Sequence, residues 1–585
     1  MFIKNLILLC ASLLLTVGTV HNVFAGVGLE LQEAPNGLNN VKTPSKTPSL
    51  PEVNPGTSKK LMDCKTKIHI SGIKFVGNKL ISSLVLTRLT EKHPIEMSMC
   101  DLHMVTRKIT DYYHNQGFLL SFAVIPPQDL KNGIVVIRVI EGKLDQAKVI
   151  HNKSLVSTKF LQEILDHYLH SGEVLKTDTL AQAVYNIQDI SSGVGKATAS
   201  PGQKVETSNI FMDVSSAQTR TSGSSVTVDD YGNPYTGAER LTGTLNLNSL
   251  TGLGDQLAIT TQVTGDIFTP GLGAGMEYVH INYTVPVTTF GTRIGFGATA
   301  LNYRIIDPAL ANIMGTGNGV IFTTFINQTL VHNEKNYTTF NLEYDHYVLS
   351  DIFGSGTSTL KDNRNLDVAT ATLAGTSNHN GYKNLPLTIN YSLSGSAGNV
   401  GITNAQADTI DSGTLKTGGL FFKGNAMSSL LAYVSNKDSV FTSLSGQLAS
   451  KNLDPSMQYI LGGPESVSAY AEGLFAGDQG FLAQFELRHD WIRDSSNNLV
   501  TKVFYDEGYI EVNRFVLTNG INSTYMGGPG VGVEDNTLHW TSSLAVSIPV
   551  GNSPSLVSNN IPGAVSFNPS GSTPIEIWLQ VGYKW

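Results

Sequence analysis

Residues 575–585 read Ile-Glu-Ile-Trp-Leu-Gln-Val-Gly-Tyr-Lys-Trp, which is the clearest alternating run in the chain. Every odd-numbered position from Ile575 to Trp585 is apolar, whereas Glu576, Gln580 and Lys584 lie on the opposite face. Side chains of a β-strand point alternately to two faces, and a strand in a membrane barrel turns its apolar face to lipid and its other face to a wet interior. The run therefore predicts a transmembrane β-strand.

Shorter alternating runs begin near residue 208 and are separated by clusters of Gly, Asn and Ser. They are 241–247, 257–263, 278–285, 339–344, 387–393, 481–487 and 539–548. At roughly 22 to 24 residues per strand and loop, the region 206–585 has room for about 16 antiparallel strands, an even number as in bacterial outer-membrane barrels. A soluble β-sandwich array or a β-helix is the alternative from the pattern alone.

Upstream of this region, residues 63–142 predict a compact α+β unit. A strand is expected at 68–73 and two more at 120–124 and 134–140, with a helix near 82–90 between them. The second helix is predicted from apolar residues at helical spacing, which are Leu102, Val105, Ile109 and Tyr112. Residues 143–205 repeat the order β-α-α-β-β more loosely, so the two units form an internal repeat.

The N-terminus is predicted to be processed. Residues 1–25 combine Lys4, an apolar stretch over 6–17 and a small residue at Ala25, which is the pattern of a secretory signal peptide. Residues 26–62 carry five prolines among Ser, Thr, Asn and Lys, and we expect an extended linker there.

Cysteine usage agrees with export. Removing the signal peptide removes Cys10 and leaves Cys64 and Cys100, which imply one disulfide in an oxidising compartment. A metal site would need further ligands at suitable spacing, and the sequence offers none nearby. We therefore expect no metal and no other cofactor.

The overall composition separates this chain from soluble enzymes. Charged residues make up 15% of it, against about 25% in soluble domains. No run of about 18 apolar residues follows the signal peptide, so no transmembrane helix is expected. The net charge of −8 argues against a nucleic-acid partner. The motifs G-x-S-x-G and H-E-x-x-H are absent, and the nearest approach to a phosphate loop, at 192–196, lacks the required spacing. We expect no enzyme.

Four stretches, in this order, carry a family resemblance. They are Ile70-Ser-Gly-Ile-Lys-Phe-Val-Gly77 with the cysteine pair, Asp229-Asp-Tyr-Gly-Asn233 with Leu253-Gly-Asp-Gln-Leu257, Tyr459-Ile-Leu-Gly-Gly463 with 466–470, and Phe504-Tyr-Asp-Glu-Gly508. Over nearly all of its mature length the chain resembles the transporter component of two-partner secretion (TpsB). The resemblance implies two periplasmic POTRA domains, at 63–142 and 143–205, followed by an all-β outer-membrane barrel of about 16 antiparallel strands at 206–585.

The resemblance also implies a functional loop. In this family loop six carries V-R-G-Y, folds into the pore, and pairs its Arg with the Asp of a strand motif F-x-D-x-G. The corresponding residues here are Val467, Ser468, Ala469 and Tyr470 in the loop, and Phe504, Asp506 and Gly508 in the strand. Because the arginine is replaced, no charge-assisted bond to the carboxylate can form.

Two substitutes for that bond follow from the sequence. Ser468 can offer one neutral hydrogen bond, worth about 1 kcal/mol net. Alternatively, Arg488 or Arg493 supplies the missing cation.

The function that the resemblance implies is translocation of an unfolded partner exoprotein from the periplasm to the cell surface, without catalysis. Outer-membrane lipids and the barrel-assembly machinery are further expected partners, and the aromatic residues Tyr583 and Trp585 form the expected C-terminal assembly signal. The alternatives are a barrel-assembly-type insertase and a passive outer-membrane channel.

Overall fold

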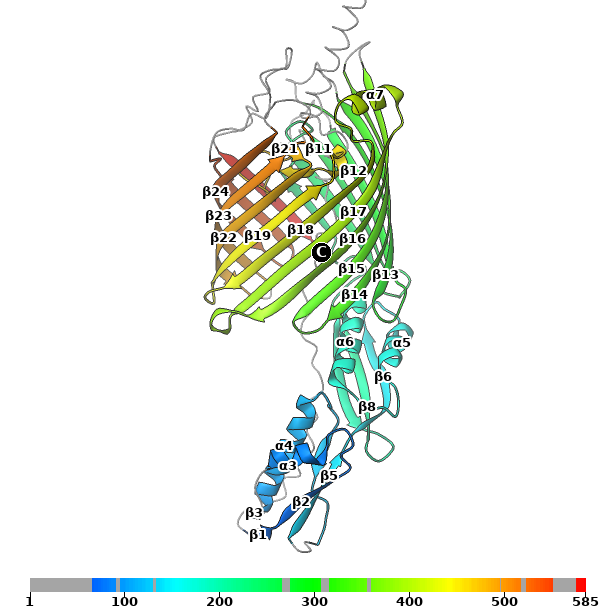
Figure 1. Cartoon of the computed structure of the whole chain (residues 1–585), viewed down its shortest axis with the longest axis vertical. Helices are drawn as coiled ribbons and strands as arrows, with labels where there is room; N and C mark the ends of the chain where they lie inside the picture. Colours follow the sequence, from blue (N-terminus) through cyan, green and yellow to red (C-terminus); the bar gives the residue numbers. More distant parts are fainter. Residues whose placement is uncertain are drawn as a thin grey trace, which may run out of the picture.

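The computed structural model describes residues 66–90, 95–129, 133–265, 274–306, 315–354, 359–494, 496–516, 522–550 and 575–585. Two small α+β units lie below one end of a large β-barrel (Figure 1). The predicted signal peptide at 1–25 and linker at 26–62 lie outside the described residues. No helix within the described ranges is long and apolar enough to cross a membrane.

The first unit contains a three-stranded sheet covered by two helices. Its elements are β1 (Lys67–Ile70), β2 (Gly72–Val76), α3 (Ser83–Thr90), β3 (Ile95–Ser98), α4 (Met99–Asn115), β4 (Phe122–Val124) and β5 (Ile134–Ile140). The sheet order is β2-β5-β4, with β2 parallel to β5, and the apolar faces of α3 and α4 pack on it. The strand predicted at 68–73 is two strands, because β1 leaves the sheet to pair with β3.

Helix α4 begins with a capping box. Ser98 Oγ accepts a hydrogen bond from the backbone N–H of Asp101 at 3.2 Å, and Asp101 Oδ2 accepts one from the backbone N–H of Ser98 at 2.8 Å. These bonds to Ser98 hold the pKa of Asp101 below its usual value. The buried stripe of the helix ends at Tyr113 and not at Tyr112 as predicted, because Tyr113 follows Ile109 by one full turn.

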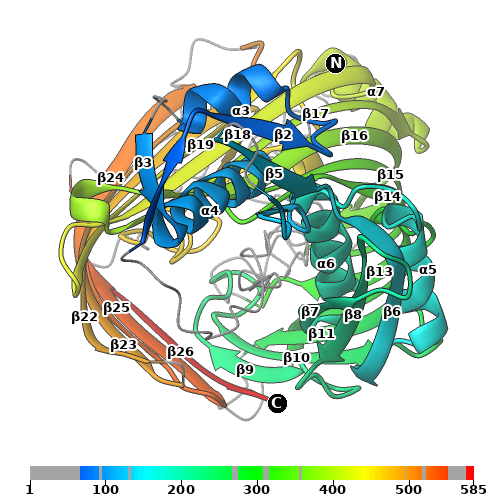
Figure 2. The same cartoon turned by 90° about the horizontal axis from the view of Figure 1, so that it is seen from below.

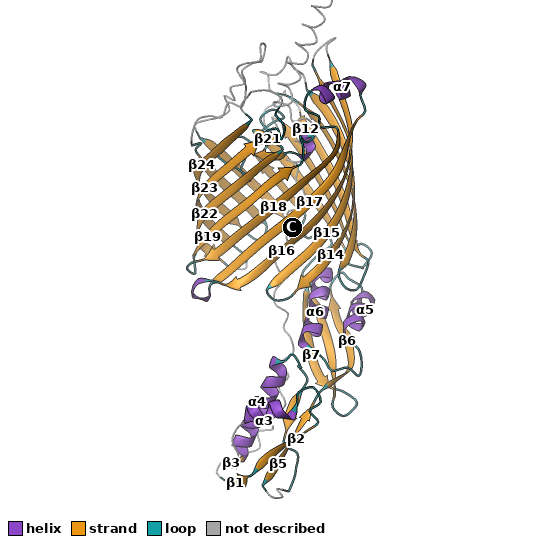
Figure 3. Cartoon of the chain, viewed as in Figure 1, coloured by secondary structure: helices purple, strands orange, loops and turns teal. Residues whose placement is uncertain are grey.

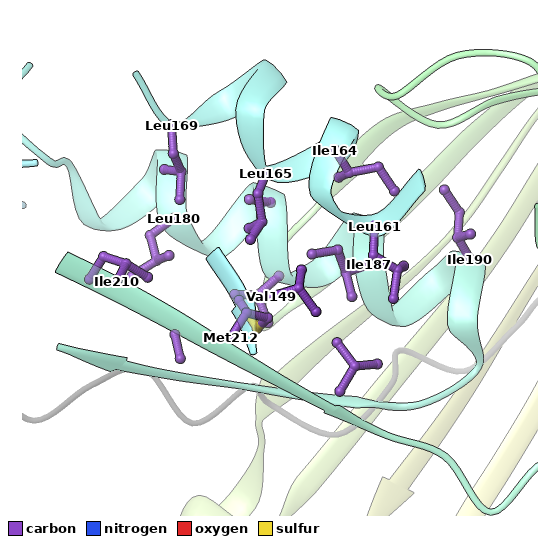
Figure 4. Close-up of a cluster of buried hydrophobic side chains, with 14 of the residues drawn as sticks. Val149, Leu161, Ile164, Leu165, Leu169, Leu180, Ile187, Ile190, Ile210 and Met212 are labelled. Atoms are coloured by element: carbon purple, nitrogen blue, oxygen red, sulfur yellow. The ribbon is translucent and has the colours of Figure 1, made fainter. Parts of the chain in front are cut away.

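The second unit repeats this architecture. It contains β6 (Lys143–Lys153), α5 (Thr158–Tyr168), α6 (Thr177–Ser191), β7 (Val194–Pro201) and β8 (Thr207–Ser215), with the sheet order β6-β8-β7. Leu161, Ile164 and Leu165 from α5 meet Ile187 from α6 above Val149 and Met212 of the sheet, as Figure 4 shows. The predicted boundary at 205/206 is wrong, because β8 completes this sheet and the barrel begins only at β9.

The barrel closes on itself without a free edge. Its strands, in order around the barrel, are β9 (Ser225–Asp229), β10 (Glu239–Asn248), β11 (Gln256–Gly265), β12 (Ala274–Pro286), β13 (Thr292–Arg304), β14 (Thr316–His332), β15 (Asn336–Phe353), β16 (Leu360–Asn380), β17 (Pro386–Ile402), β18 (Gly419–Tyr433), β19 (Asp438–Ala449), β22 (Gln479–Arg493), β23 (Asn498–Glu511), β24 (Ser523–Asn536), β25 (Trp540–Ser547) and β26 (Glu576–Lys584). All neighbours are antiparallel, and β26 pairs with β9. The barrel wall consists of strands, which are joined by turns and loops (Figure 3). Sixteen strands thus close the barrel, as predicted. One helix, α7 (Ala405–Gly413), lies between β17 and β18.

Strand β26 has the two faces that its sequence predicts. Ile577, Leu579, Val581 and Tyr583 are exposed on the outside of the barrel, whereas Trp578 is buried on the inside. The neighbouring strands continue this exposed face. Leu544 on β25 and Val531 on β24 are in register with its residues and are also exposed. The outer face of the barrel is therefore apolar along these strands.

Helix α6 of the second unit contacts the nearer rim of the barrel. The Asp189 carboxylate lies 2.8 Å from His332 Nδ1 at the end of β14, and Tyr185 stacks on the same imidazole with ring centroids 4.4 Å apart. Arg293 donates to the backbone oxygen of Asp189 at 3.4 Å. Figure 2, seen from below, places α6 and β7 nearer to the barrel axis than β6.

The described residues contain one of the two cysteines of the predicted disulfide. Cys100, at the start of α4, is disulfide-bonded, but Cys64 lies outside the described residues. We predict that these two cysteines pair. A bridge that closes a loop of about 36 residues would stabilise the first unit by roughly 3 to 4 kcal/mol. Peptide mass spectrometry without reductant should recover the 64–100 crosslink, and free thiols at both positions would exclude it.

Candidate functional site

Loop six comprises residues 450–478 and connects β19 to β22. Inside it β20 (Tyr459–Leu461) and β21 (Phe475–Gly477) pair as an antiparallel hairpin at the barrel end remote from the two α+β units (Figure 1). The tip residues Val467, Ser468, Ala469 and Tyr470 are all buried. Their contacts are with the lumen face of β23 to β26, so the loop folds back into the barrel.

The first anchor of the tip is Asp506, on the lumen face of β23. Ser468 donates twice to Asp506 Oδ2, from its hydroxyl at 2.7 Å and from its backbone N–H at 3.2 Å. Gln484 Nε2, on the neighbouring strand, donates to Asp506 Oδ1 at 3.4 Å and to the backbone oxygen of Ser466 at 3.0 Å. The carboxylate is thus surrounded by neutral donors in place of a cation.

The second anchor holds the backbone oxygen of Ser468. Ser547 Oγ, at the end of β25, donates to this oxygen at 2.6 Å, and Trp578 Nε1 on β26 donates to it at 2.7 Å. Both donors are buried. Sequence reasoning missed both. A lumen-facing Trp in an otherwise polar row of β26 is the signal that could have pointed to Trp578.

Small residues in the wall make room for the tip. A Cβ atom placed on Gly508 would lie 2.8 Å from Leu461 Cδ1 and 2.9 Å from Val467 Cγ2, and one on Gly528 would lie 2.6 Å from Ala469 Cβ. The tip and wall form one apolar cluster, whose buried members are Leu461, Val467, Ala469, Tyr470, Phe475, Leu482, Ile510 and Met526. Phe504 stands apart from this cluster, with its ring lying where a Cβ on Gly530 would be.

The base of the loop is bound to the opposite wall. Arg364 on β16 pairs with Asp351 on β15 and places its other terminal nitrogen 3.3 Å from Asp454 of loop six. Gln447 Nε2 donates to the backbone oxygen of Met457 at 2.9 Å. Loop six therefore spans the lumen between two walls.

Neither of the two candidate cations reaches Asp506. Arg488 binds Glu486, and Arg493 lies 3.7 Å from Asp490 while its guanidinium covers the ring of Tyr433. The place of the family arginine is therefore filled by the hydroxyl and backbone N–H of Ser468.

The aromatic residues at the end of β26 form a cluster of their own. Tyr583 packs edge-on against Trp540, with ring centroids 5.0 Å apart, and Trp585 packs against Tyr583 at 6.0 Å. The backbone N–H of Trp585 donates to Ser224 at 3.1 Å, and its backbone oxygen accepts from Gly223 at 2.9 Å. These residues form an exposed aromatic cluster at the barrel seam.

A closed sixteen-stranded barrel, α+β units beneath it and a long loop folded into its lumen together make up the architecture that the resemblance to two-partner secretion transporters implies. The family described as haemolysin secretion/activation protein ShlB/FhaC/HecB matches residues 207–533, and the POTRA domain of ShlB type matches residues 68–142. The chain belongs to this family of transporters.

Relatives of the chain carry transporter names. The heme/hemopexin transporter protein HuxB of Haemophilus influenzae is 24% identical over 460 residues, which cover 78% of each chain. The solved structure of CdiB from Escherichia coli has a TM-score of 0.66 at 18% identity and covers 98% of each chain. CdiB from Acinetobacter baumannii has a TM-score of 0.60 at 15% identity, covering 95% of this chain and 96% of that one. The predicted family, fold class, outer-membrane location and transport function are confirmed.

Proposed function

We propose that this chain passes an unfolded partner exoprotein through its barrel to the cell surface, and that loop six is the movable obstruction. The observation that carries the proposal is the way the loop tip is held. Val467 to Tyr470 are fixed by packing and by hydrogen bonds to Asp506, Ser547 and Trp578. All of these contacts are noncovalent, so an entering chain can displace the tip without any covalent or nucleotide chemistry.

Strand β7 is the proposed capture edge for the partner. In the described part of the chain β7 has a ladder partner on one side only, which is β8. The other edge strand, β6, is partly covered, because Gln162 bonds to the backbone of Val149 at 2.9 Å and of Ala147 at 3.0 Å. An extended segment can add to a free strand edge through backbone hydrogen bonds. The position of β7 beneath the barrel opening favours transfer into the lumen (Figure 2).

The outer surface of the barrel suits two further partners, which are outer-membrane lipid and the barrel-assembly machinery. The exposed apolar band on β24 to β26 suits outer-membrane lipid. Tyr583 and Trp585 are proposed to be the signal that the barrel-assembly machinery reads, and their place at the seam supports this role because the last strand must close the barrel. We infer that the chain is not an enzyme and needs no cofactor, in keeping with a family of transporters.

Two other functions are separable by experiment. A barrel-assembly-type insertase would act on many outer-membrane proteins, and a passive channel would act on small solutes. Loop six across the lumen argues against a permanently open channel, because it occupies the path.

Deleting the gene and restoring it on a plasmid tests the function. We expect one or a few large exoproteins to disappear from the surface and medium, with the levels of other outer-membrane barrels unchanged. A general fall in barrel proteins would indicate an insertase instead. Unchanged exoproteins with altered solute uptake would indicate a passive channel.

A further inference from the structure

Strand β26 closes the barrel along a short seam. Its partner β9 contributes only five residues, Ser225–Asp229, whereas β15 and β16 in the opposite wall have 18 and 21 residues. The seam ladder has five residue pairs, as does the ladder of β9 with β10, and the other ladders of the barrel are longer. Any side chain that braces it has a larger share in keeping the barrel closed.

Tyr231 is such a brace. It follows β9 directly, and its ring meets the ring of Trp578 on β26 edge-on, with centroids 6.0 Å apart. Its hydroxyl lies 2.9 Å from Ser543 Oγ on β25, and the guanidinium of Arg240 on β10 covers its ring at 5.6 Å. Arg240 in turn bonds Asp229 at 2.6 Å. Tyr231 thus connects the first two strands of the barrel to the last two.

Trp578 takes part both in the barrel seam and in the anchoring of loop six. Its ring supports Tyr231 across the seam, and its indole N–H holds the backbone oxygen of Ser468 at the tip of loop six. The side chain is 5% exposed, so neither contact is replaced by water while the loop is in place. Movement of the loop tip and movement of the seam therefore each disturb the contacts of the same indole ring.

We propose that Trp578 is a positioning residue that couples loop six to closure of the barrel seam. This inference rests on the proposed role of loop six as the obstruction. When the tip withdraws, Trp578 loses its acceptor and the seam loses a fixed brace. By linkage, loosening the seam must also loosen the tip by the same factor.

Chemical labelling of the loop tip tests the coupling. The reporter is Val467→Cys, a position that is fully buried while the loop is seated. In purified barrels we measure its rate of reaction with a membrane-impermeant maleimide, and protein without the reporter supplies the background. Trp578→Phe keeps an aromatic ring but removes the N–H donor, and we expect it to raise the rate about fivefold, since one hydrogen bond is lost. Ser547→Ala, which removes the other donor, should act similarly.

A second pair of variants tests the link to the seam. Tyr231→Ala should also raise the labelling rate several-fold, because it removes the support of Trp578. In a Trp578→Ala background the same Tyr231→Ala change should add nothing. An equal effect of Tyr231→Ala in both backgrounds would overturn the coupling.

The matched control is Trp491→Phe. Trp491 also donates its indole N–H within the barrel, to Thr501 Oγ1 at 3.0 Å, but its side chain is exposed and remote from the loop. We expect no change in labelling, and an equal rise in Trp491→Phe and Trp578→Phe would reject a specific role for Trp578. Heat-modifiable gel mobility confirms that each variant is a folded barrel. Labelling of purified barrels needs no exported partner. A negative labelling result therefore rejects the coupling without rejecting the transport function, and a negative secretion result rejects the transport function without rejecting the coupling.

Discussion

Alanine in place of Asp506 is expected to release loop six and to raise channel conductance in planar bilayers. The substitution leaves the hydroxyl and the backbone N–H of Ser468 without an acceptor at a buried site. Each unpaired buried donor costs roughly 1 to 3 kcal/mol, so the loss of both bonds destabilises the seated loop by about 2 to 6 kcal/mol and raises its open fraction more than tenfold. A loop that no longer seats should also impair secretion of the partner, measured in the medium.

The neighbouring carboxylate provides the control. Glu507 points away from the lumen and accepts a hydrogen bond from Tyr505 at 2.9 Å. Glu507→Ala should therefore leave conductance unchanged, and Asp506→Asn, which keeps one acceptor oxygen, should give an intermediate value. Equal conductance in Asp506→Ala and the unaltered protein would mean that this carboxylate does not hold the loop.

The alternation of β26 was predictable because a transmembrane strand needs apolar side chains on its outer face. The outer face must be apolar, and Ile577 to Tyr583 follow that rule over the whole strand. The region predicted as barrel, 206–585, also included β8, where Ile210, Met212 and Val214 alternate but point at helices of the second unit. Alternation reports that one face is apolar and does not report whether helices or lipid cover it.

The anchors of loop six show a different limit. Asp506 was recognisable because it belongs to a short motif, but its partners are set by the closed barrel. Ser547 and Trp578 lie 79 and 110 residues from Ser468 in sequence and meet it only after β25 and β26 have completed the wall. A hydrogen bond from Ser468 was one of the two predicted substitutes for the missing arginine, and the Ser468 hydroxyl does bind Asp506. The backbone N–H of Ser468, which no sequence displays as a ligand, supplies the rest of the replacement.

Valine in place of Gly508 is expected to unseat loop six by filling the space that its tip occupies. Even the first atom of a side chain there would lie under 3 Å from Leu461 and Val467, and valine adds two more methyl groups. Overpacking of this kind costs roughly 1 to 3 kcal/mol, and the loop can escape the clash by leaving the lumen. We expect higher conductance in planar bilayers in the order Gly508, Gly508→Ala, Gly508→Val.

The effect should fall on the loop and not on the barrel itself. Gly508 lies within β23 without a positive φ, and valine is well suited to strands. Gly395→Val on β17 is the matched control, since a Cβ there meets nothing within 4 Å. Both variants should show heat-modifiable mobility, but only Gly508→Val should change conductance. If the two variants behave alike, Gly508 does not form the seat of loop six, and the contacts of the tip with Asp506, Gly528, Ser547 and Trp578 would have to hold it.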